Sequence, residues 1–155
     1  MGIKKSLGIK IIVVCVVFFC SCGPDYNEEF IDFVIINESG IDIRINPNPP
    51  ISEQFPTSVR SSFLVANNDA FSEVIEINTR DANFSFRTFF GTDNIEIIYG
   101  NERKVSYSCA NGDESNNCEN SRNILSFRAN SDNRAEYIFT VNDFDIAMPC
   151  DGNCN

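Results

Sequence analysis

The sequence has 155 residues, of which 12 are basic and 22 acidic, so its formal net charge is −10. This acidic balance argues against nucleic acid as a partner, because binding to the phosphate backbone depends on clustered Lys and Arg. The absence of histidine excludes a Ser-His-Asp triad, a Cys-His pair and a histidine-ligated catalytic zinc. The sequence also has no Gly-rich phosphate loop and no nucleophile elbow. We therefore expect a chain that is not an enzyme and needs no cofactor.

The N-terminal segment has the layout of a secretory signal. Lys4, Lys5 and Lys10 precede the apolar residues 11–20, and the small residue Ser21 follows. The apolar run is about half of the roughly 20 residues that a membrane-spanning helix needs, so a permanent span is the weaker interpretation. We expect residues 1–21 to be removed as a signal peptide.

The end of this segment, Phe19-Cys20-Ser21-Cys22, resembles a lipobox, at which a cysteine receives diacylglycerol before cleavage. It departs from the usual motif, because Phe19 replaces a leucine and Cys20 a small or β-branched residue. Cys20 is the poorer acceptor, since bulky Phe19 precedes it. Palmitate-type acylation at Cys22 would anchor the chain in the cell envelope, with the outer membrane as the expected location. The alternative is a secreted protein with a free cysteine.

Removal of the leader takes away three lysines and no acid, which leaves 9 basic and 22 acidic residues and a formal charge of −13. Such a surface favours solubility, and it leaves attraction to a basic protein open. It disfavours adsorption to anionic lipid, so the lipid on Cys22 is the expected membrane contact. Residues 22–29 are predicted to be the lipidated cysteine and an acidic tether, and residues 30–155 a single domain.

Alternation of apolar and polar residues predicts β-strands throughout this domain. It is plainest in residues 41–46, where Ile41, Ile43 and Ile45 face one way. The same pattern, bounded by turn-forming residues, predicts further strands at residues 33–36, 62–65, 74–77, 84–87, 95–99, 105–108, 124–127 and 137–141.

The connections between these strands favour an antiparallel arrangement. Asn37-Glu38-Ser39-Gly40 is predicted to close one hairpin, with Gly40 at positive φ, and Gly100-Asn101-Glu102 a second. The one predicted helical turn covers residues 142–148, which Asn142 would cap and Pro149 would end. About eight or nine short strands with this chemistry predict an all-β fold, a single antiparallel β-sandwich or small barrel with one short C-terminal helical turn.

The sequence contains 14 Phe and no Trp, and we interpret the rings as core filling. Phe84, Phe86, Phe127 and Phe139 fall on inward positions of the predicted strands, as a two-layer core requires. The alternative, an aromatic platform for a ligand, needs exposed rings at adjacent positions.

Four cysteines, Cys109, Cys118, Cys150 and Cys154, lie in the predicted domain. In an oxidising compartment they would form two disulfides, for which three connectivities exist. Pairing Cys109 with Cys118 and Cys150 with Cys154 is favoured, because each pair closes a short polar loop. A bond between the C-terminal tail and the first loop stays open, and it would close a longer loop. No metal site is predicted, because zinc ligands usually pair about two to four residues apart and only Cys150 and Cys154 come close.

Two polar loops, residues 111–120 and 151–155, offer oxygen ligands of the kind that calcium prefers. Neither matches the EF-hand pattern. Because Asn, Asp, Gly and Ser are also the common turn formers, we interpret both loops as turns.

The layout resembles a set of small lipoproteins of unassigned function from Bacteroidetes-type bacteria. The resemblance rests on four segments, at residues 36–43, 93–98, 122–125 and 137–147. It carries no catalytic or ligand residues to this chain. In such bacteria, acidic residues shortly after the lipidated cysteine accompany export to the cell surface, and Asp25, Glu28 and Glu29 are similar in kind. The resemblance thus implies display at the cell surface, with a domain that faces the periplasm as the alternative.

Three functions are compatible with these features. The first is a non-enzymatic binding module at the cell envelope, with a protein or glycan as partner. The second is an acidic inhibitor or immunity-type lipoprotein directed at a basic enzyme such as a lysozyme, suggested by the charge of the domain. The third, a carboxylate-based glycosidase, is the weakest, because the scattered Asp and Glu residues form no local signature.

Overall fold

The computed structural model describes residues 29–51, 59–77, 84–110 and 118–154. Within these residues, no helix is both long and apolar enough to cross a membrane. In chain order, the elements are β1 (Glu29–Glu38), β2 (Ile43–Pro47), β3 (Phe63–Val65), β4 (Ala70–Ile77), α2 (Phe86–Phe90), β5 (Asn94–Tyr99), β6 (Arg103–Ser108), the 3-10 turn η1 (Ile124–Ser126), β7 (Arg134–Thr140), α3 (Val141–Ile146) and β8 (Met148–Pro149).

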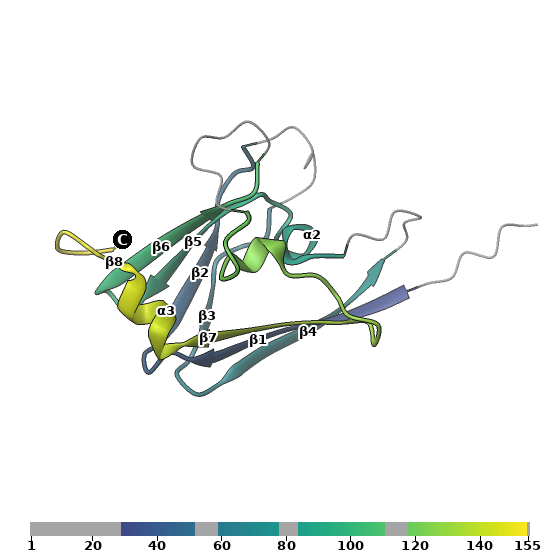
Figure 1. Ribbon diagram of the computed structural model, residues 1–155, viewed down its shortest axis with the longest axis horizontal. Coiled ribbons are helices and arrows are strands. Elements are labelled where there is room, and N and C mark those ends of the chain that lie inside the picture. The colour runs from purple at the N-terminus through teal and green to yellow at the C-terminus, as the bar shows by residue number, and fades with distance from the viewer. Residues whose placement is uncertain (1–28, 52–58, 78–83, 111–117, 155) are drawn as a thin grey trace, which may run out of the picture.

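The strands form two open sheets, with the orders β4-β1-β7 and β3-β2-β5-β6-β8. The predicted β-sandwich with a short C-terminal helix is confirmed, and the barrel alternative is not the one adopted. The sheets lie close together where α3 and β8 are found and diverge toward the other end, where α2 lies between them (Figure 1). One pairing departs from the antiparallel prediction: β1 and β7 are parallel, with Asp32 opposite Arg134 and Glu38 opposite Thr140.

The predicted hairpin at residues 37–40 is wrong, because β1 and β2 belong to different sheets. Residues between them cross from one sheet to the other. The buried Asn37 amide donates to the Ile41 carbonyl over 2.8 Å and to the Val65 carbonyl over 3.0 Å, and its oxygen accepts from the Ser39 hydroxyl over 2.6 Å. These bonds replace the ladder that a hairpin would supply. Gly40 does adopt a positive φ, of 89°, and the second predicted hairpin, between β5 and β6, is confirmed.

The predicted strand at residues 84–87 is also wrong. Ser85 forms an isolated bridge with Arg128, after which the chain turns into α2. Phe86, Phe89 and Phe90 are all buried, and their spacing is the i, i+3, i+4 pattern of a helix rather than the period of two. The helix ends at Gly91, whose φ of 68° is the left-handed conformation that ends many helices.

The predicted strand at residues 124–127 is a 3-10 turn instead. Ile124 and Leu125 are adjacent and both fully buried, which one inward face of a strand does not allow. Asn123 begins the turn: its side-chain oxygen accepts from the Leu125 N–H over 3.0 Å, and its amide donates to the Ser108 carbonyl over 3.1 Å.

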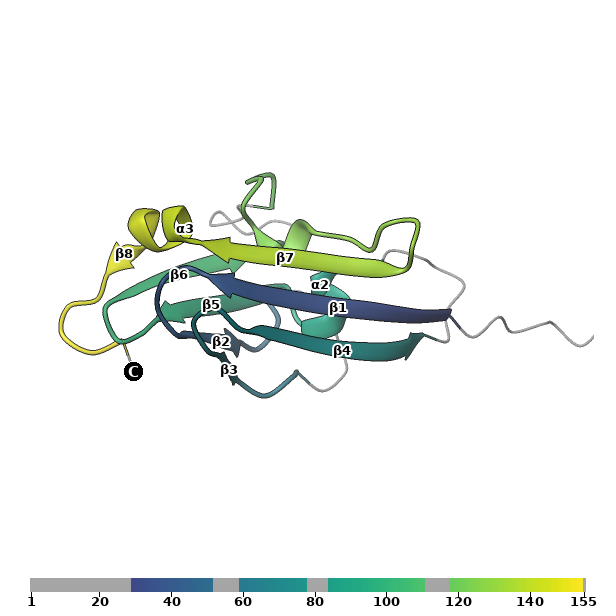
Figure 2. The same ribbon diagram turned by 90° about the horizontal axis from the view of Figure 1, so that it is seen from below.

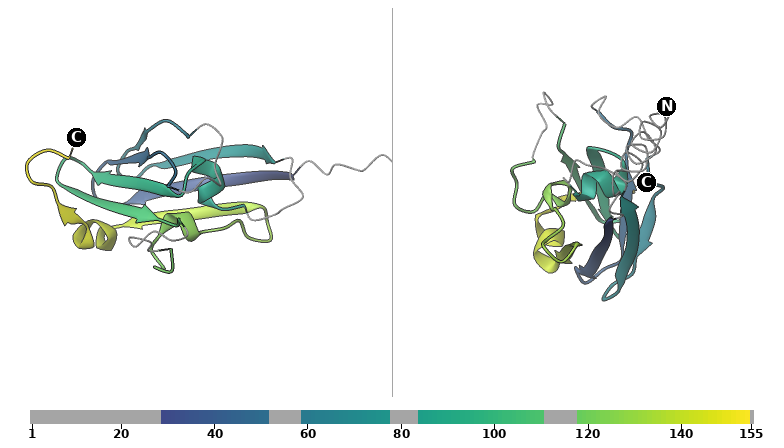
Figure 3. Two further views of the ribbon diagram at one scale, coloured as in Figure 1. Left: turned by 90° about the horizontal axis from the view of Figure 1, so that it is seen from above. Right: turned by 90° about the vertical axis from the view of Figure 1, so that its right-hand side faces the viewer.

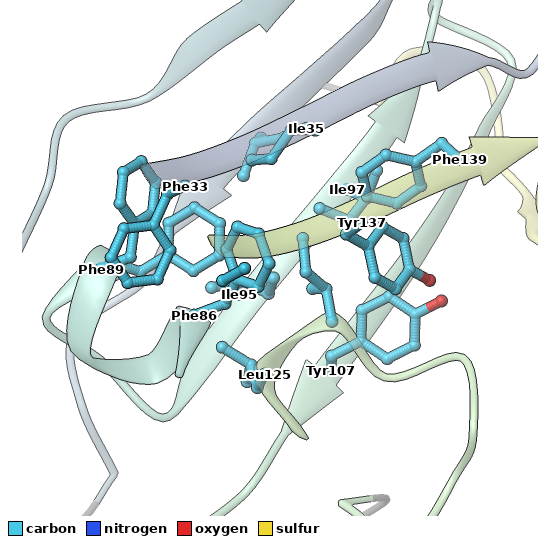
Figure 4. Close-up of a cluster of buried hydrophobic side chains, with 14 of the residues drawn as sticks. Phe33, Ile35, Phe86, Phe89, Ile95, Ile97, Tyr107, Leu125, Tyr137 and Phe139 are labelled. Atoms are coloured by element: carbon cyan, nitrogen blue, oxygen red, sulfur yellow. The ribbon is translucent and has the colours of Figure 1, made fainter. Parts of the chain in front are cut away.

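The core lies between the two sheets and extends to the end of the molecule where the sheets diverge. Inward residues of β1 and β5 lie beside the rings of α2 there, and those of β7 lie farther along the same core (Figure 4). The Phe33 ring lies 5.4 Å from that of Phe86 and 4.9 Å from that of Phe89, between ring centroids. Phe84, Phe86 and Phe139 are buried as predicted, and Phe127 is half-buried against the Tyr137 ring. The phenylalanines therefore fill the core.

Candidate functional site

The structure pairs the four cysteines of the domain. Cys109 is bonded to Cys118, with 4.7 Å between their Cα atoms, and Cys150 to Cys154, with 5.4 Å. This is the pairing that the short polar loops favour, and it leaves no thiol among these four for zinc. Cys22, the predicted lipidation site, lies outside the described residues, as do residues 111–117 and 155 of the two polar loops.

The described residues offer little to a metal ion or to an aromatic ligand platform. They contain no group of three or more Cys, Asp or Glu side chains placed to hold a metal. Of the described Phe and Tyr residues, Phe30 alone is exposed, and the rest are buried or half-buried.

A buried ion pair fixes the start of α3. The Asp143 side chain is fully buried and accepts from Arg122, over 2.7 Å from Nε and 2.5 Å from Nη2. It also accepts from the Thr140 N–H over 2.7 Å and from the Thr140 hydroxyl over 2.8 Å. Thr140 is thus the N-cap of α3, in place of the predicted Asn142, and Asp143 closes a capping box with it.

The electrostatics of this pair are those of a structural element. Burial opposes ionisation of Asp143, but the hydrogen bonds from Arg122 and Thr140 outweigh it and hold the pKa of Asp143 below its ordinary value. Burial raises the pKa values of the neighbouring Tyr107 and Tyr137 hydroxyls (Figure 4), and Tyr137 donates to the Arg122 carbonyl over 2.6 Å. These shifts move the pKa values of all three groups away from neutral pH, the range in which a general acid or base works best.

A second arginine joins the end of α3 to β6. Arg103, at the start of β6, donates through Nη1 to the Asp145 carbonyl over 2.9 Å and to the Ala147 carbonyl over 3.0 Å. Its guanidinium carbon lies 5.2 Å from the centroid of the Phe144 ring. These contacts satisfy carbonyls at the end of α3, where the helix leaves them unpaired. Arg122 and Arg103 together hold α3 on the sandwich, and β8 pairs with β6 through its backbone.

This end of the molecule exposes three large apolar side chains within eight consecutive residues. Val141, Ile146 and Met148 are 54%, 61% and 64% exposed. Val141 and Ile146 project about 140° apart around this short helix, whereas Ile146 and Met148 are only two residues apart in the chain. Clustered exposed apolar groups on a rigid support are typical of interaction surfaces.

We call this region the α3–β8 end; it comprises α3, β8, residues 150–154 and the turns at residues 38–42, 66–69 and 100–102. The turns are connected to it through the backbone: Cys150 N–H donates to the Glu102 carbonyl over 2.9 Å, and Glu38 pairs with Thr140 at the start of α3. Asn37 N–H in turn donates to the Asp69 carbonyl over 2.9 Å. Six exposed carboxylates lie in it, those of Glu38, Asp42, Asp69, Glu102, Asp145 and Asp151. The end of the molecule that carries the exposed apolar side chains is therefore also rich in negative charge.

The other exposed large apolar residues in the described chain are more dispersed. Phe30 and Val74 are diagonal neighbours on the outer face of the β4-β1-β7 sheet. They lie beside a set of ion pairs in which Arg134 contacts Asp32 and Glu136. Leu64 lies on the outer face of the other sheet, at the edge, and Ile51 lies in a connection. Neither group equals the α3–β8 end in apolar exposure.

Sequence reasoning did not find this surface, although one signal for it was present. Thr140 and Asp143 have the spacing of a capping box, which marks the start of α3 two residues earlier than Asn142 does. A helix that starts there leaves Val141 and Ile146 among its exposed residues.

Comparison with protein-family models, with curated proteins and with solved structures finds no match for this chain.

Proposed function

We propose that this chain is a lipoprotein of the cell envelope, anchored by a lipid on Cys22, whose domain is a non-enzymatic interaction module that contacts its partner through the α3–β8 end. The observation that carries the proposal is the group of three exposed apolar side chains on a firmly held helix and strand. Such exposure has a solvation cost that an interaction surface explains.

The placement of the two ends of the sandwich supports this role. β1 begins at Glu29, at the end of the molecule opposite α3 and β8 (Figures 2 and 3). Its ten residues span about 33 Å. Only residues 23–28 separate Cys22 from this strand. An anchor on Cys22 would therefore hold the Glu29 end near the membrane and present the α3–β8 end away from it.

An acidic inhibitor or immunity-type lipoprotein is the second candidate. The six carboxylates at the α3–β8 end favour it, since a negative surface can cover the active site of a basic enzyme. An acidic face around the Cys109–Cys118 loop would favour it further, but most of that loop lies outside the described residues. Loss of lysozyme activity on addition of the chain would distinguish this candidate from a module that binds without inhibiting.

The anchor and the surface can be tested separately. Mass spectrometry of the chain purified from membranes should find an N-terminal peptide that begins at diacylated Cys22, and Cys22→Ser should move the chain out of the membrane fraction. A photoreactive amino acid at position 146 should then cross-link a partner in intact cells, whereas the same group at the equally exposed position 74 should not. An unmodified N-terminus would exclude the anchor, and equal cross-linking at both positions would exclude the surface.

A further inference from the structure

We infer that the partner of the α3–β8 end is a cationic protein segment, in which an apolar side chain is flanked by Lys or Arg. This inference deepens the proposed function and rests on it. The apolar anchor of the segment would contact Ile146 and Met148, and its cations would face the surrounding carboxylates. Specific contacts of this kind combine a central apolar group with a charged rim.

The charge around the apolar residues is not neutralised within the described part of the chain. None of the six carboxylates forms an ion pair there. Two cations of β6 at this end are already engaged: Arg103 donates to two carbonyls, and Lys104, opposite Met148, pairs with Glu96 over 3.0 Å. Glu38 ends β1 and Glu102 lies in the turn between β5 and β6, so the negative charge comes from different parts of the fold.

The same charges argue against other occupants. Anionic lipid would be repelled by the carboxylates, and an anchored domain already holds this end away from its own membrane. A second copy of the chain would bring two sets of carboxylates together, and this repulsion between like charges opposes self-association. A cationic segment removes the repulsion among the six carboxylates and covers the apolar side chains at the same time. Met148 suits such a partner, because its flexible thioether adapts to different shapes.

The test uses the lipidated chain in discs of zwitterionic lipid, with empty discs as the blank. The probe is a short synthetic peptide of Lys and Leu, and the comparison peptide replaces every Leu with Ser at the same charge. Three variants are measured beside the parent: Ile146→Ser with Met148→Ser, the triple change Glu102→Gln, Asp145→Asn and Asp151→Asn, and the control Val74→Ser. Val74 is 61% exposed, as is Ile146, so the control removes an equal apolar exposure elsewhere.

We expect the parent to bind the Lys-Leu peptide more tightly than the Lys-Ser peptide. The apolar double variant should weaken Lys-Leu binding about tenfold and abolish the preference for Leu. The charge variant should also weaken binding about tenfold at low salt and should show a smaller loss of affinity when salt is raised. Val74→Ser should leave the dissociation constant unchanged. Circular dichroism checks that each variant is folded.

Equal affinity for the two peptides, or equal weakening by Val74→Ser, would overturn the inference, since binding would then be unspecific attraction to an acidic protein. Dimerisation that is promoted by salt and lost with Ile146→Ser would overturn it in favour of a second copy. The cross-link at position 146 separates this inference from the proposed function. A partner captured there that lacks a basic surface would retain the function and exclude the cationic segment, whereas no cross-link at 146 would remove both.

Discussion

The ion pair between Arg122 and Asp143 gives the sharpest test of how α3 is held. Asp143→Asn keeps the shape of the side chain but places a neutral amide against the guanidinium. Removing one partner of a buried pair costs about 3–5 kcal/mol. Because the Arg122 side chain keeps 32% of its exposure, water can partly solvate the remaining charge. We therefore expect the free energy of unfolding, measured by urea titration at neutral pH, to fall by about 2–3 kcal/mol.

The pH dependence of the same variant follows from the sign of the pKa shift. The pKa of Asp143 in the folded chain lies below its ordinary value of 3.8, so the stabilisation is present above that value and is lost as the pH falls through the folded pKa. The parent and Asp143→Asn should thus approach equal stability in acid. Asp145→Asn, an exposed change in the same helix, is the control and should alter stability by less than about 0.5 kcal/mol. A deficit equal to that of the control, or one that does not shrink in acid, would refute this reasoning.

Two further substitutions test the turns. Gly100 has a φ of 57°, and a Cβ there would lie 2.6 Å from Cδ1 of Ile41. Gly100→Ala should therefore lower the free energy of unfolding by about 1–2 kcal/mol, and by less in an Ile41→Ala background. Additive losses in this double-mutant cycle would contradict the clash. Asn37→Ala should cost about 2–3 kcal/mol in urea unfolding, because it leaves the Ile41 and Val65 carbonyls without their donor. The exposed Asn101→Ala is its control, and equal effects of the two changes would exclude the role of the Asn37 amide.

Much of the fold follows from local patterns in the sequence. Seven of the nine predicted strand segments coincide with strands of the structure, from residues 33–36 in β1 to 137–141 in β7, because alternation reports a half-buried pleat directly. The two wrong predictions, at residues 84–87 and 124–127, rest on segments of only four residues, which are too short to distinguish a strand from a helical turn. Continuing past Arg87 to Phe89 and Phe90 turns an apparent strand into a helix period, and two adjacent buried residues do not fit one face of a strand.

Long-range relations could not be obtained in the same way. The predicted hairpin at residues 37–40 has suitable turn residues. Whether β2 pairs with β1 or crosses to the other sheet depends on contacts with strands that lie far away in the sequence. The candidate surface depends on a similar relation, since Arg122 and Arg103 reach α3 from other parts of the chain. The cysteine pairs were easier, because each closes a loop that is short along the chain.

The parallel pairing of β1 and β7 determines when the domain can be completed. Asp32 lies opposite Arg134, so a chain that emerges N-terminus first must wait for roughly one hundred further residues before this side of its first strand is covered. Until then β1 can pair with β4 but keeps its other edge free, which is the state most open to chaperones and to association with other chains. Assembly therefore ends with β7, α3 and β8, and the proposed interaction surface forms only when the sandwich beneath it is finished.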